Sequence, residues 1–154
     1  MNTPSTATQP SAIAGLGLFA IRRFSAGERI APYSGPLTSV QPSTPAASSP
    51  VYALEVSPGV WLDGSRVDNP SRHANHSCQP NAELVWQGET AGAWLIAFHA
   101  IETGSEITFD YGFSLAESLF HPCRCGAPEC AGRIIASPLR PALRRHLRFS
   151  RPRD

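Results

Sequence analysis

The chain has 154 residues, of which 42% are hydrophobic, and its formal net charge is only +1. This length fits one domain with a single core, and no apolar run reaches the roughly 18 residues of a membrane-spanning helix. The N-terminal stretch lacks the basic start and apolar segment of a secretory signal. We therefore expect an intracellular, cytoplasmic protein without membrane contact, whose cysteines serve metal binding or catalysis rather than disulfides.

The first third of the chain predicts short strands separated by turns. Residues 1–12 are rich in Thr, Ser, Pro and Gln, and we expect them to be flexible. The stretch GLGLFAIRRFSAGERIAPYSG, residues 15–35, predicts two short strands joined by a Ser-Ala-Gly-Glu turn. Residues 38–50 have the low-complexity composition of a surface loop.

The rest of the chain predicts further short strands and little helix. The strand candidates are VYALEV and VWLDG (a hairpin), AELVW and AWLIAFHAI around a GETAG turn, and EITFDYG. Residues 70–77 predict one helical turn, and LAESLF predicts a short helix. The 15 prolines and 12 glycines favour short strands and tight turns, so the expected class is mostly β with small sheets.

The four cysteines predict a metal site. Cys123, Cys125 and Cys130 form a C-x-C-x4-C cluster, which supplies three of the four thiolates typical of structural zinc. The only other cysteine is Cys78, in the segment NHSCQPN. Two alternatives are inert or disulfide-bonded cysteines, and a Cys78 nucleophile activated by His76. Because a nucleophile would leave the cluster one ligand short, we predict that Cys78 is the fourth zinc ligand.

Five short motifs follow one another along the chain in a characteristic order. They are the G-x-G of GLGLFA (15–20), YSG (33–35), NHSCQPN (75–81), EITFDYG (106–112) and CRCGAPECAG (123–132). In this order, with every cysteine accounted for, the chain resembles the SET-domain protein-lysine methyltransferases that carry a post-SET zinc loop. The resemblance covers roughly residues 13–135.

The resemblance implies a fold of small β-sheets in which the EITFDYG segment passes through a loop formed near NHSC, as in a pseudoknot. The expected organisation is a flexible N-terminus (1–12), a SET domain (13–117), a post-SET zinc loop (121–135) and an Arg-rich tail (136–154). The irregular NHSC stretch would then be one half of a crossing that forms the active site.

The resemblance also implies a reaction, the transfer of a methyl group from S-adenosylmethionine to a lysine ε-amine in a protein. Tyr111 would be the catalytic residue, and Tyr33, Tyr52 and Phe109 would line the lysine channel. Phe109 implies room for di- or trimethylation, and Phe109→Tyr should shift products toward monomethyl-lysine. The implied cofactor-binding residues are Gly15, Leu16, Gly17, Leu18, Arg72, Asn75 and His76. The implied ligands of one structural Zn²⁺ are Cys78, Cys123, Cys125 and Cys130.

The charge of the chain is segregated. Residues 133–154 hold seven arginines and one acid, a net charge of +6, whereas residues 1–132 hold six arginines and eleven acids, a net charge of −5. Leucines at 139, 143 and 147 predict one amphipathic helix in the basic segment. This tail could cover the cofactor, contact nucleic acid or acidic partners, or be a solvated helix.

Two other functions stay open from the sequence. The chain could be an inactive SET-fold module that binds a protein or nucleic acid, or a zinc-stabilised nucleic-acid binder that uses its arginine tail. A homodimer is plausible on size grounds, and a nuclear or chromatin-associated location would follow if the protein were eukaryotic or delivered to a host.

Overall fold

The structure is a computed structural model, and it describes residues 4–40 and 52–149. Most of the predicted low-complexity loop at 38–50 lies outside these residues. The elements are β1 (Thr6–Pro10), β2 (Leu16–Ala20), β3 (Arg29–Tyr33), β4 (Leu37–Thr38), β5 (Ala53–Ser57), β6 (Val60–Asp63), η1 (Pro70–His73), β7 (Asn75–His76), β8 (Ala82–Trp86), β9 (Ala93–Ala97), β10 (Glu106–Phe109), α1 (Leu115–Ser118), η2 (Ser137–Leu139) and α2 (Arg140–Phe149).

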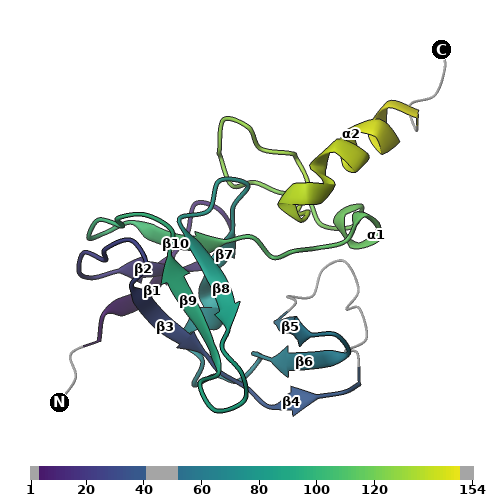
Figure 1. Cartoon of the computed structure of the whole chain (residues 1–154). Helices are drawn as coiled ribbons and strands as arrows, with labels where there is room; N and C mark the ends of the chain where they lie inside the picture. Colours follow the sequence, from purple (N-terminus) through teal and green to yellow (C-terminus); the bar gives the residue numbers. More distant parts are fainter. Residues whose placement is uncertain (1–3, 41–51, 150–154) are drawn as a thin grey trace.

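The strands form three small sheets, which confirms the expected mostly β class (Figure 1). Their strand orders are β1-β2-β10-β7, β3-β9-β8 and β4-β6-β5. The predicted hairpins are confirmed, since β5 pairs antiparallel with β6 and β8 pairs antiparallel with β9. No helix of the described residues is both long and apolar enough to cross a membrane.

The N-terminal segment departs from the expected flexibility. Strand β1 pairs antiparallel with β2, from Thr6 opposite Ala20 to Pro10 opposite Leu16. Edge pairing satisfies backbone donors and acceptors without apolar side chains, so a polar composition does not reveal it. The expectation of a flexible segment over residues 1–12 therefore does not hold for Thr6–Pro10, while residues 1–3 lie outside the described part.

One apolar cluster joins the first two sheets. Leu18, Phe24, Leu95, Ile101 and Ile107 belong to it, and each is at most 2% exposed. Strand β9 shows the pattern behind this burial, because its alternate residues are buried, with Leu95 and Ala97 in this cluster, while those between are only partly buried. This core supports the segments that contain the candidate site residues.

Residues 75–81 run alongside the end of β10. Thr108 and Phe109 pair in parallel with Asn75 and His76. The side chain of Asn81 then replaces strand pairing, donating to the Glu106 carbonyl at 2.8 Å and accepting from the Thr108 amide at 2.9 Å. These two hydrogen bonds satisfy backbone groups of β10 beside the irregular 75–81 segment, and the contacts bring together the two segments of the expected crossing.

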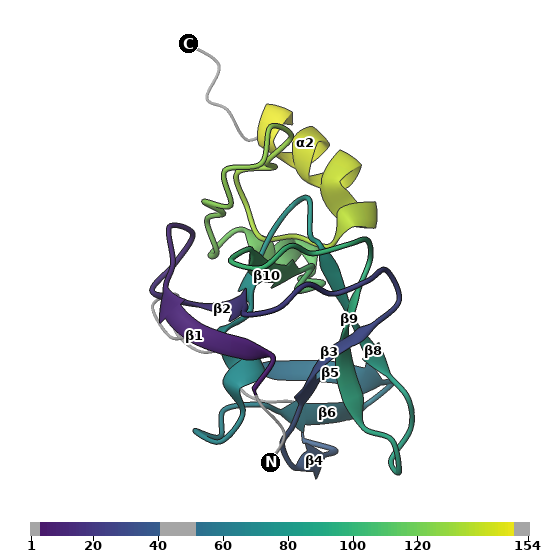
Figure 2. The same cartoon turned by 90° about the vertical axis from the view of Figure 1, so that its left-hand side faces the viewer.

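We use the term C-terminal lobe for residues 114–149, which contain α1, the cysteine loop, η2 and α2. In both views α2 lies at the end of the molecule away from the β4-β6-β5 sheet (Figures 1 and 2). The predicted amphipathic helix is confirmed over Arg140–Phe149, with Leu143 buried on its inner side. Leu139 precedes the helix in η2, and Leu147 is 38% exposed.

Candidate active site

Two cavities of very different size adjoin each other in the structure. A narrow cavity of about 10 Å³ lies among the side chains of Tyr33, Phe109 and other residues of the core. A broad cleft of about 760 Å³ lies on the other side, between the 13–16 loop and the cysteine loop. Arg72, Tyr111 and Phe113 line both. Tyr111 therefore stands where a large ligand and a slender one could meet.

The narrow cavity has aromatic walls. The Phe109 ring centroid lies 4.9 Å from that of Tyr111 and 6.4 Å from that of Tyr33. The Tyr33 hydroxyl donates to the Tyr52 carbonyl at 3.0 Å, and burial raises the pKa of this hydroxyl. Gly64 is required beside it, because an added Cβ would lie 2.2 Å from the Tyr33 ring. A narrow cavity with aromatic walls suits an unbranched aliphatic chain such as that of lysine.

The Tyr111 hydroxyl is fixed at the junction of the two cavities. It donates to the Ala74 carbonyl at 3.0 Å, and the Tyr111 amide donates to His76 Nδ1 at 3.3 Å. Burial raises the pKa of the Tyr111 phenol, so this group stays protonated at neutral pH. It can orient an amine or polarise a methyl group, but it cannot serve as an anionic base.

His76 is neutral in this site. Burial lowers its pKa to about 4, and its Nδ1 accepts the Tyr111 amide proton. Its Nε2 lies 3.7 Å from Cys78 Sγ, which is close enough for the nucleophile alternative. However, Cys78 Sγ also lies 3.8 Å from Cys123 Sγ, within the cysteine cluster. This arrangement favours Cys78 as a member of the cysteine cluster over Cys78 as a nucleophile.

The cleft gathers most of the residues expected at the cofactor. Those that line it are Gly15, Leu16, Arg72, Asn75 and His76, joined by Tyr52, which was expected in the channel instead. Leu18 is fully buried in the core and Gly17 is buried beside Glu106, so neither lines the cleft.

The two glycines of the G-x-G motif serve different purposes. Gly15 has a φ of +45° and open space around a notional Cβ, so its requirement is conformational. At Gly17 an added Cβ would lie 2.4 Å from Glu106 Oε1, so the missing side chain makes room for a carboxylate of the protein itself.

Sequence reasoning missed two residues, Ser11 and Glu106, which surround the amide of Asn75. Glu106 stands inside the EITFDYG motif, so its position in the motif was the available signal. Ser11 had no signal, since it lies in a polar stretch that the sequence presents as flexible.

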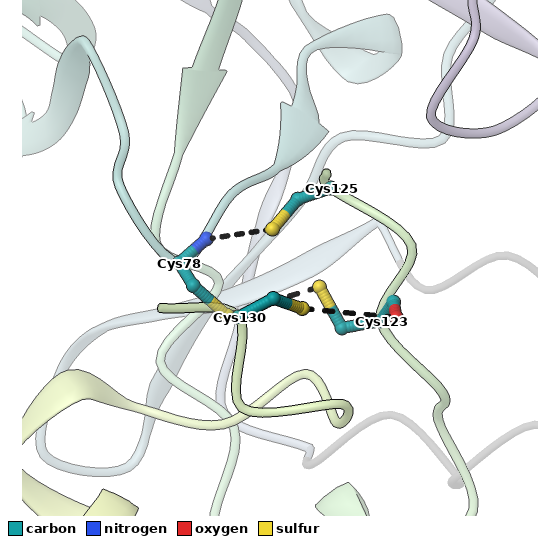
Figure 3. Close-up of side chains that lie close together, drawn as sticks. All are labelled: Cys78, Cys123, Cys125 and Cys130. Atoms are coloured by element: carbon teal, nitrogen blue, oxygen red, sulfur yellow. Dashed lines mark hydrogen bonds between the residues drawn. The ribbon is translucent and has the colours of Figure 1, made fainter. Parts of the chain in front are cut away.

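The four cysteines converge as predicted, with their sulfurs pointing toward one another (Figure 3). All are free thiols, and the four Sγ atoms lie within 4.8 Å of one another. Tetrahedral Zn–S bonds of about 2.3 Å place sulfurs about 3.8 Å apart, which matches the 3.8 Å between Cys78 and Cys123. The geometry and the all-thiol donor set therefore fit a zinc ion better than disulfides.

The surroundings of the cluster act differently on its thiols, since burial raises the pKa of Cys78 and of Cys123 whereas the pKa of Cys125 is lowered. Burial opposes ionisation of Cys125, but the backbone N–H groups of Cys78 and Ala127 and the neighbouring thiols together lower its pKa to about 6. The Cys78 amide donates to Cys125 Sγ at 3.4 Å, and the Ala131 amide donates to Cys78 Sγ at 3.4 Å. Such amide donors also support the sulfurs of a bound metal.

This combination of small sheets, an aromatic junction and a C-terminal cysteine cluster agrees with the class that the motifs indicate. Residues 15–112 match the SET domain family, described as "SET domain". Because this match spans more than half of the chain, the chain belongs to the SET domain family.

Curated relatives carry the names of histone-lysine methyltransferases. The chain is 41% identical over 86 residues to "Histone-lysine N-methyltransferase ash1" of Drosophila melanogaster, which covers 54% of the chain and 4% of the relative. It is 31% identical over 133 residues to "Histone-lysine N-methyltransferase, H3 lysine-4 specific" of Cryptococcus neoformans, and this alignment covers 79% of the chain and 9% of the relative. It is 27% identical over 139 residues to "Histone-lysine N-methyltransferase ASHH3" of Arabidopsis thaliana, and this alignment covers 84% of the chain and 38% of the relative. The chain thus spans well under half the length of each.

Proposed function

We propose that this chain transfers a methyl group from S-adenosylmethionine to the ε-amine of lysine in a protein substrate. The observation that carries the proposal is the pair of cavities, one broad and one narrow and aromatic, that meet at the Tyr111 hydroxyl. Placing two reactants in line through separate entrances supplies much of the rate advantage of such a reaction.

S-adenosylmethionine supplies a methyl group on a positively charged sulfur, and attack by the neutral amine forms the C–N bond, breaks the C–S bond and leaves a proton for solvent. The protein must therefore receive lysine in its neutral form, at a cost of about 4 kcal/mol near pH 7.5. The buried rings of Tyr33, Phe109 and Tyr111 favour the neutral amine by desolvation. The fixed Tyr111 hydroxyl orients the amine toward the cleft.

The residues of the cleft fit this cofactor. Apolar side chains such as Ile13, Leu16 and Ile134 suit an adenine ring, Arg72 and Arg124 suit a carboxylate, and Asn75 offers an amide. We also propose that the four cysteines hold one structural zinc ion, which would fix the cysteine loop as a wall of the cleft. Cys123 belongs both to the zinc ligands and to the residues that line the cleft.

The proposed substrate is a lysine-rich protein, with histones as the first candidate. The names of the relatives specify histone lysines, including lysine 4 and lysine 36 of H3. The net charge of −5 on residues 1–132 favours approach of a basic polypeptide. A chromatin-associated location would follow from such a substrate. Phe109, buried at 3% exposure, supports di- or trimethyl products because it brings no hydroxyl into the narrow cavity.

The proposal is tested by transfer of radiolabelled methyl from S-adenosylmethionine to mixed histones and to a cell lysate. The zinc-loaded protein is compared with Tyr111→Phe, and folding of both is checked by circular dichroism. We expect label on lysine, and a loss of at least about 100-fold in rate in the variant, of the size seen when an oriented catalytic group is removed. Tight cofactor binding without label on any protein would favour the inactive binding module instead.

We propose in addition that the outer face of α2 contacts nucleic acid. Arg144, Arg145 and Arg148 lie on this exposed face and form no ion pair within the described residues. By contrast, the exposed Arg22, Arg23 and Arg66 each pair with a carboxylate at 2.7 to 3.0 Å. Guanidinium groups left without acids are suited to phosphates.

The chain offers a matched test of this contact. Binding of a labelled DNA duplex is measured by fluorescence anisotropy as a function of salt, for the full chain and for two triple Arg→Gln variants. The variant at 144, 145 and 148 should weaken binding and lower the slope of log affinity against log salt by about 3. The variant at 22, 23 and 66 removes the same charge and should have little effect. Equal losses would contradict a contact through α2.

The expected homodimer rests on size alone and stays a prediction.

A further inference from the structure

The side chain of Asn75 is held from one side by the protein itself. Its Nδ2 lies 2.7 Å from Glu106 Oε1, 3.1 Å from Ser11 Oγ, 3.1 Å from the Leu16 carbonyl and 3.2 Å from the Ala14 carbonyl. All four neighbours offer oxygen acceptors, so only the NH₂ end of the amide can face them. An inverted amide would place its oxygen against a carboxylate and two carbonyls.

Ser11 and Glu106 form a unit around this amide. The Ser11 hydroxyl lies 2.7 and 2.9 Å from the two Glu106 oxygens, and it accepts the Ile13 amide proton at 2.9 Å. Gly17 leaves the space that the carboxylate occupies. Glu106 belongs to β10, Ser11 follows β1, and the loop between β1 and β2 lines the cleft. The unit therefore ties three segments together at the edge of the cleft.

The other end of the Asn75 amide has no hydrogen-bond partner among the described residues, and it is not sealed in the interior. Asn75 lines the broad cleft, so its Oδ1 is the atom available there. A carbonyl oxygen held in this orientation can only accept a hydrogen bond, so it selects a ligand that carries a donor, such as an ammonium group.

We propose that Ser11 and Glu106 are positioning residues that hold Asn75 Oδ1 toward the cleft, where it accepts a hydrogen bond from the α-ammonium group of S-adenosylmethionine. This inference rests on the proposed function. It gives a role to Ser11, which lies outside the range 15–112 that matches the family.

The inference predicts an interaction specific to one group of the ligand. Isothermal titration calorimetry with the zinc-loaded protein compares S-adenosylhomocysteine with its analogue that lacks the α-amino group. The wild type should bind the complete ligand at least about tenfold more tightly. Ser11→Ala and Glu106→Gln should each weaken binding of the complete ligand by about threefold to tenfold and leave binding of the deaminated analogue unchanged.

Glu83→Gln is the matched control, because Glu83 is an exposed carboxylate on β8, and its affinities for both ligands should equal those of the wild type. Thermal melting shows whether each variant is folded, and Ser11→Ala keeps the test open if Glu106→Gln does not fold. If the wild type binds both ligands equally, or if Ser11→Ala and Glu106→Gln weaken both ligands alike, the inference is overturned while the proposed function stands. If the wild type binds neither ligand, both fall.

Discussion

The core and the C-terminal lobe of this protein are held together by different physics. The core, from β1 to Phe113, contains a continuous apolar cluster whose members are almost completely buried. In the C-terminal lobe, residues 114–149, the buried hydrophobic residues are Ile135 and Leu143. Two such residues cannot hold 36 residues in place at roughly 2 kcal/mol each. The lobe therefore needs its cysteine cluster to stay folded, whereas the core does not.

The candidate active site lies between these two regions. Tyr111 follows the last core strand, and the lobe contributes His121, Cys123 and Ile134 to the wall of the cleft. The lobe is attached by few polar contacts, among them the Ser137 amide to Asp110 Oδ2 at 2.8 Å and Arg140 Nη2 to the Cys78 carbonyl at 2.6 Å. Narrow-cavity geometry therefore depends on the core, and cleft geometry depends on both.

Removal of zinc is expected to have the largest effect, because structural zinc contributes on the order of 10 kcal/mol to small metal-stabilised units. Chelation, or Cys123→Ser, should open the lobe and abolish cofactor binding while the core strands stay folded. Hydrogen exchange with mass spectrometry should show loss of protection in 114–149 and retained protection in β2, β9 and β10. Uniform loss of protection through the chain would show that the two regions are one cooperative unit.

One buried leucine in each region should respond differently to truncation. Leu95 is 0% exposed in the core and Leu143 is 1% exposed in the lobe. Leu95→Ala should lower the free energy of global unfolding by about 2–5 kcal/mol, through lost burial and a residual cavity. Leu143→Ala should leave global unfolding by urea nearly unchanged and raise only the exchange rates of α2. Equal shifts in the urea midpoint would place both leucines in one folding unit.

The pH dependence of the methyl-transfer rate distinguishes ionisation of Tyr111 from ionisation of the substrate lysine. Because burial raises the Tyr111 pKa, the neutral phenol persists as pH rises, and its hydrogen bond to Ala74 is kept. Methyl transfer at low lysine-peptide concentration should therefore rise about tenfold per pH unit from 7 to 9, as the substrate amine loses its proton. A fall in rate between pH 8.5 and 9.5, with the fold intact, would mean that Tyr111 ionises in this range.

The smallest expected effect lies inside the narrow cavity. Phe109→Tyr adds a hydroxyl group to a cavity of about 10 Å³, so it should slow the second and third methyl transfers and increase the monomethyl share several-fold. Mass spectrometry of a lysine peptide measures this distribution. Phe98→Tyr, at an exposed position away from the site, is the control and should match the wild type. An unchanged distribution in Phe109→Tyr would show that this wall does not limit the product.

Much of the site was predictable because its chemistry depends on few residue types at fixed spacing. The four cysteines converge as the sequence predicts, because thiolates at this spacing suit one metal ion. The predicted strand EITFDYG is confirmed for its first part, Glu106–Phe109, while Asp110–Gly112 lie outside any strand. Strand β1 was missed because its pairing uses backbone groups that every sequence offers. The reason why residue 17 must be a glycine could not be predicted either, because it is the close approach of the Glu106 carboxylate, which is distant in sequence. Tyr52 lines the cleft for a similar reason, because its place depends on how two sheets pack.

The proposed function can be tested by a crystal structure of the zinc-loaded chain with S-adenosylhomocysteine and a lysine peptide. We expect the cofactor product in the broad cleft beside Asn75, and the lysine side chain in the narrow cavity between Tyr33 and Phe109. The lysine nitrogen should point past the Tyr111 hydroxyl toward the sulfur. A lysine that enters through the broad cleft, or a cofactor product bound away from Asn75, would contradict the proposed function.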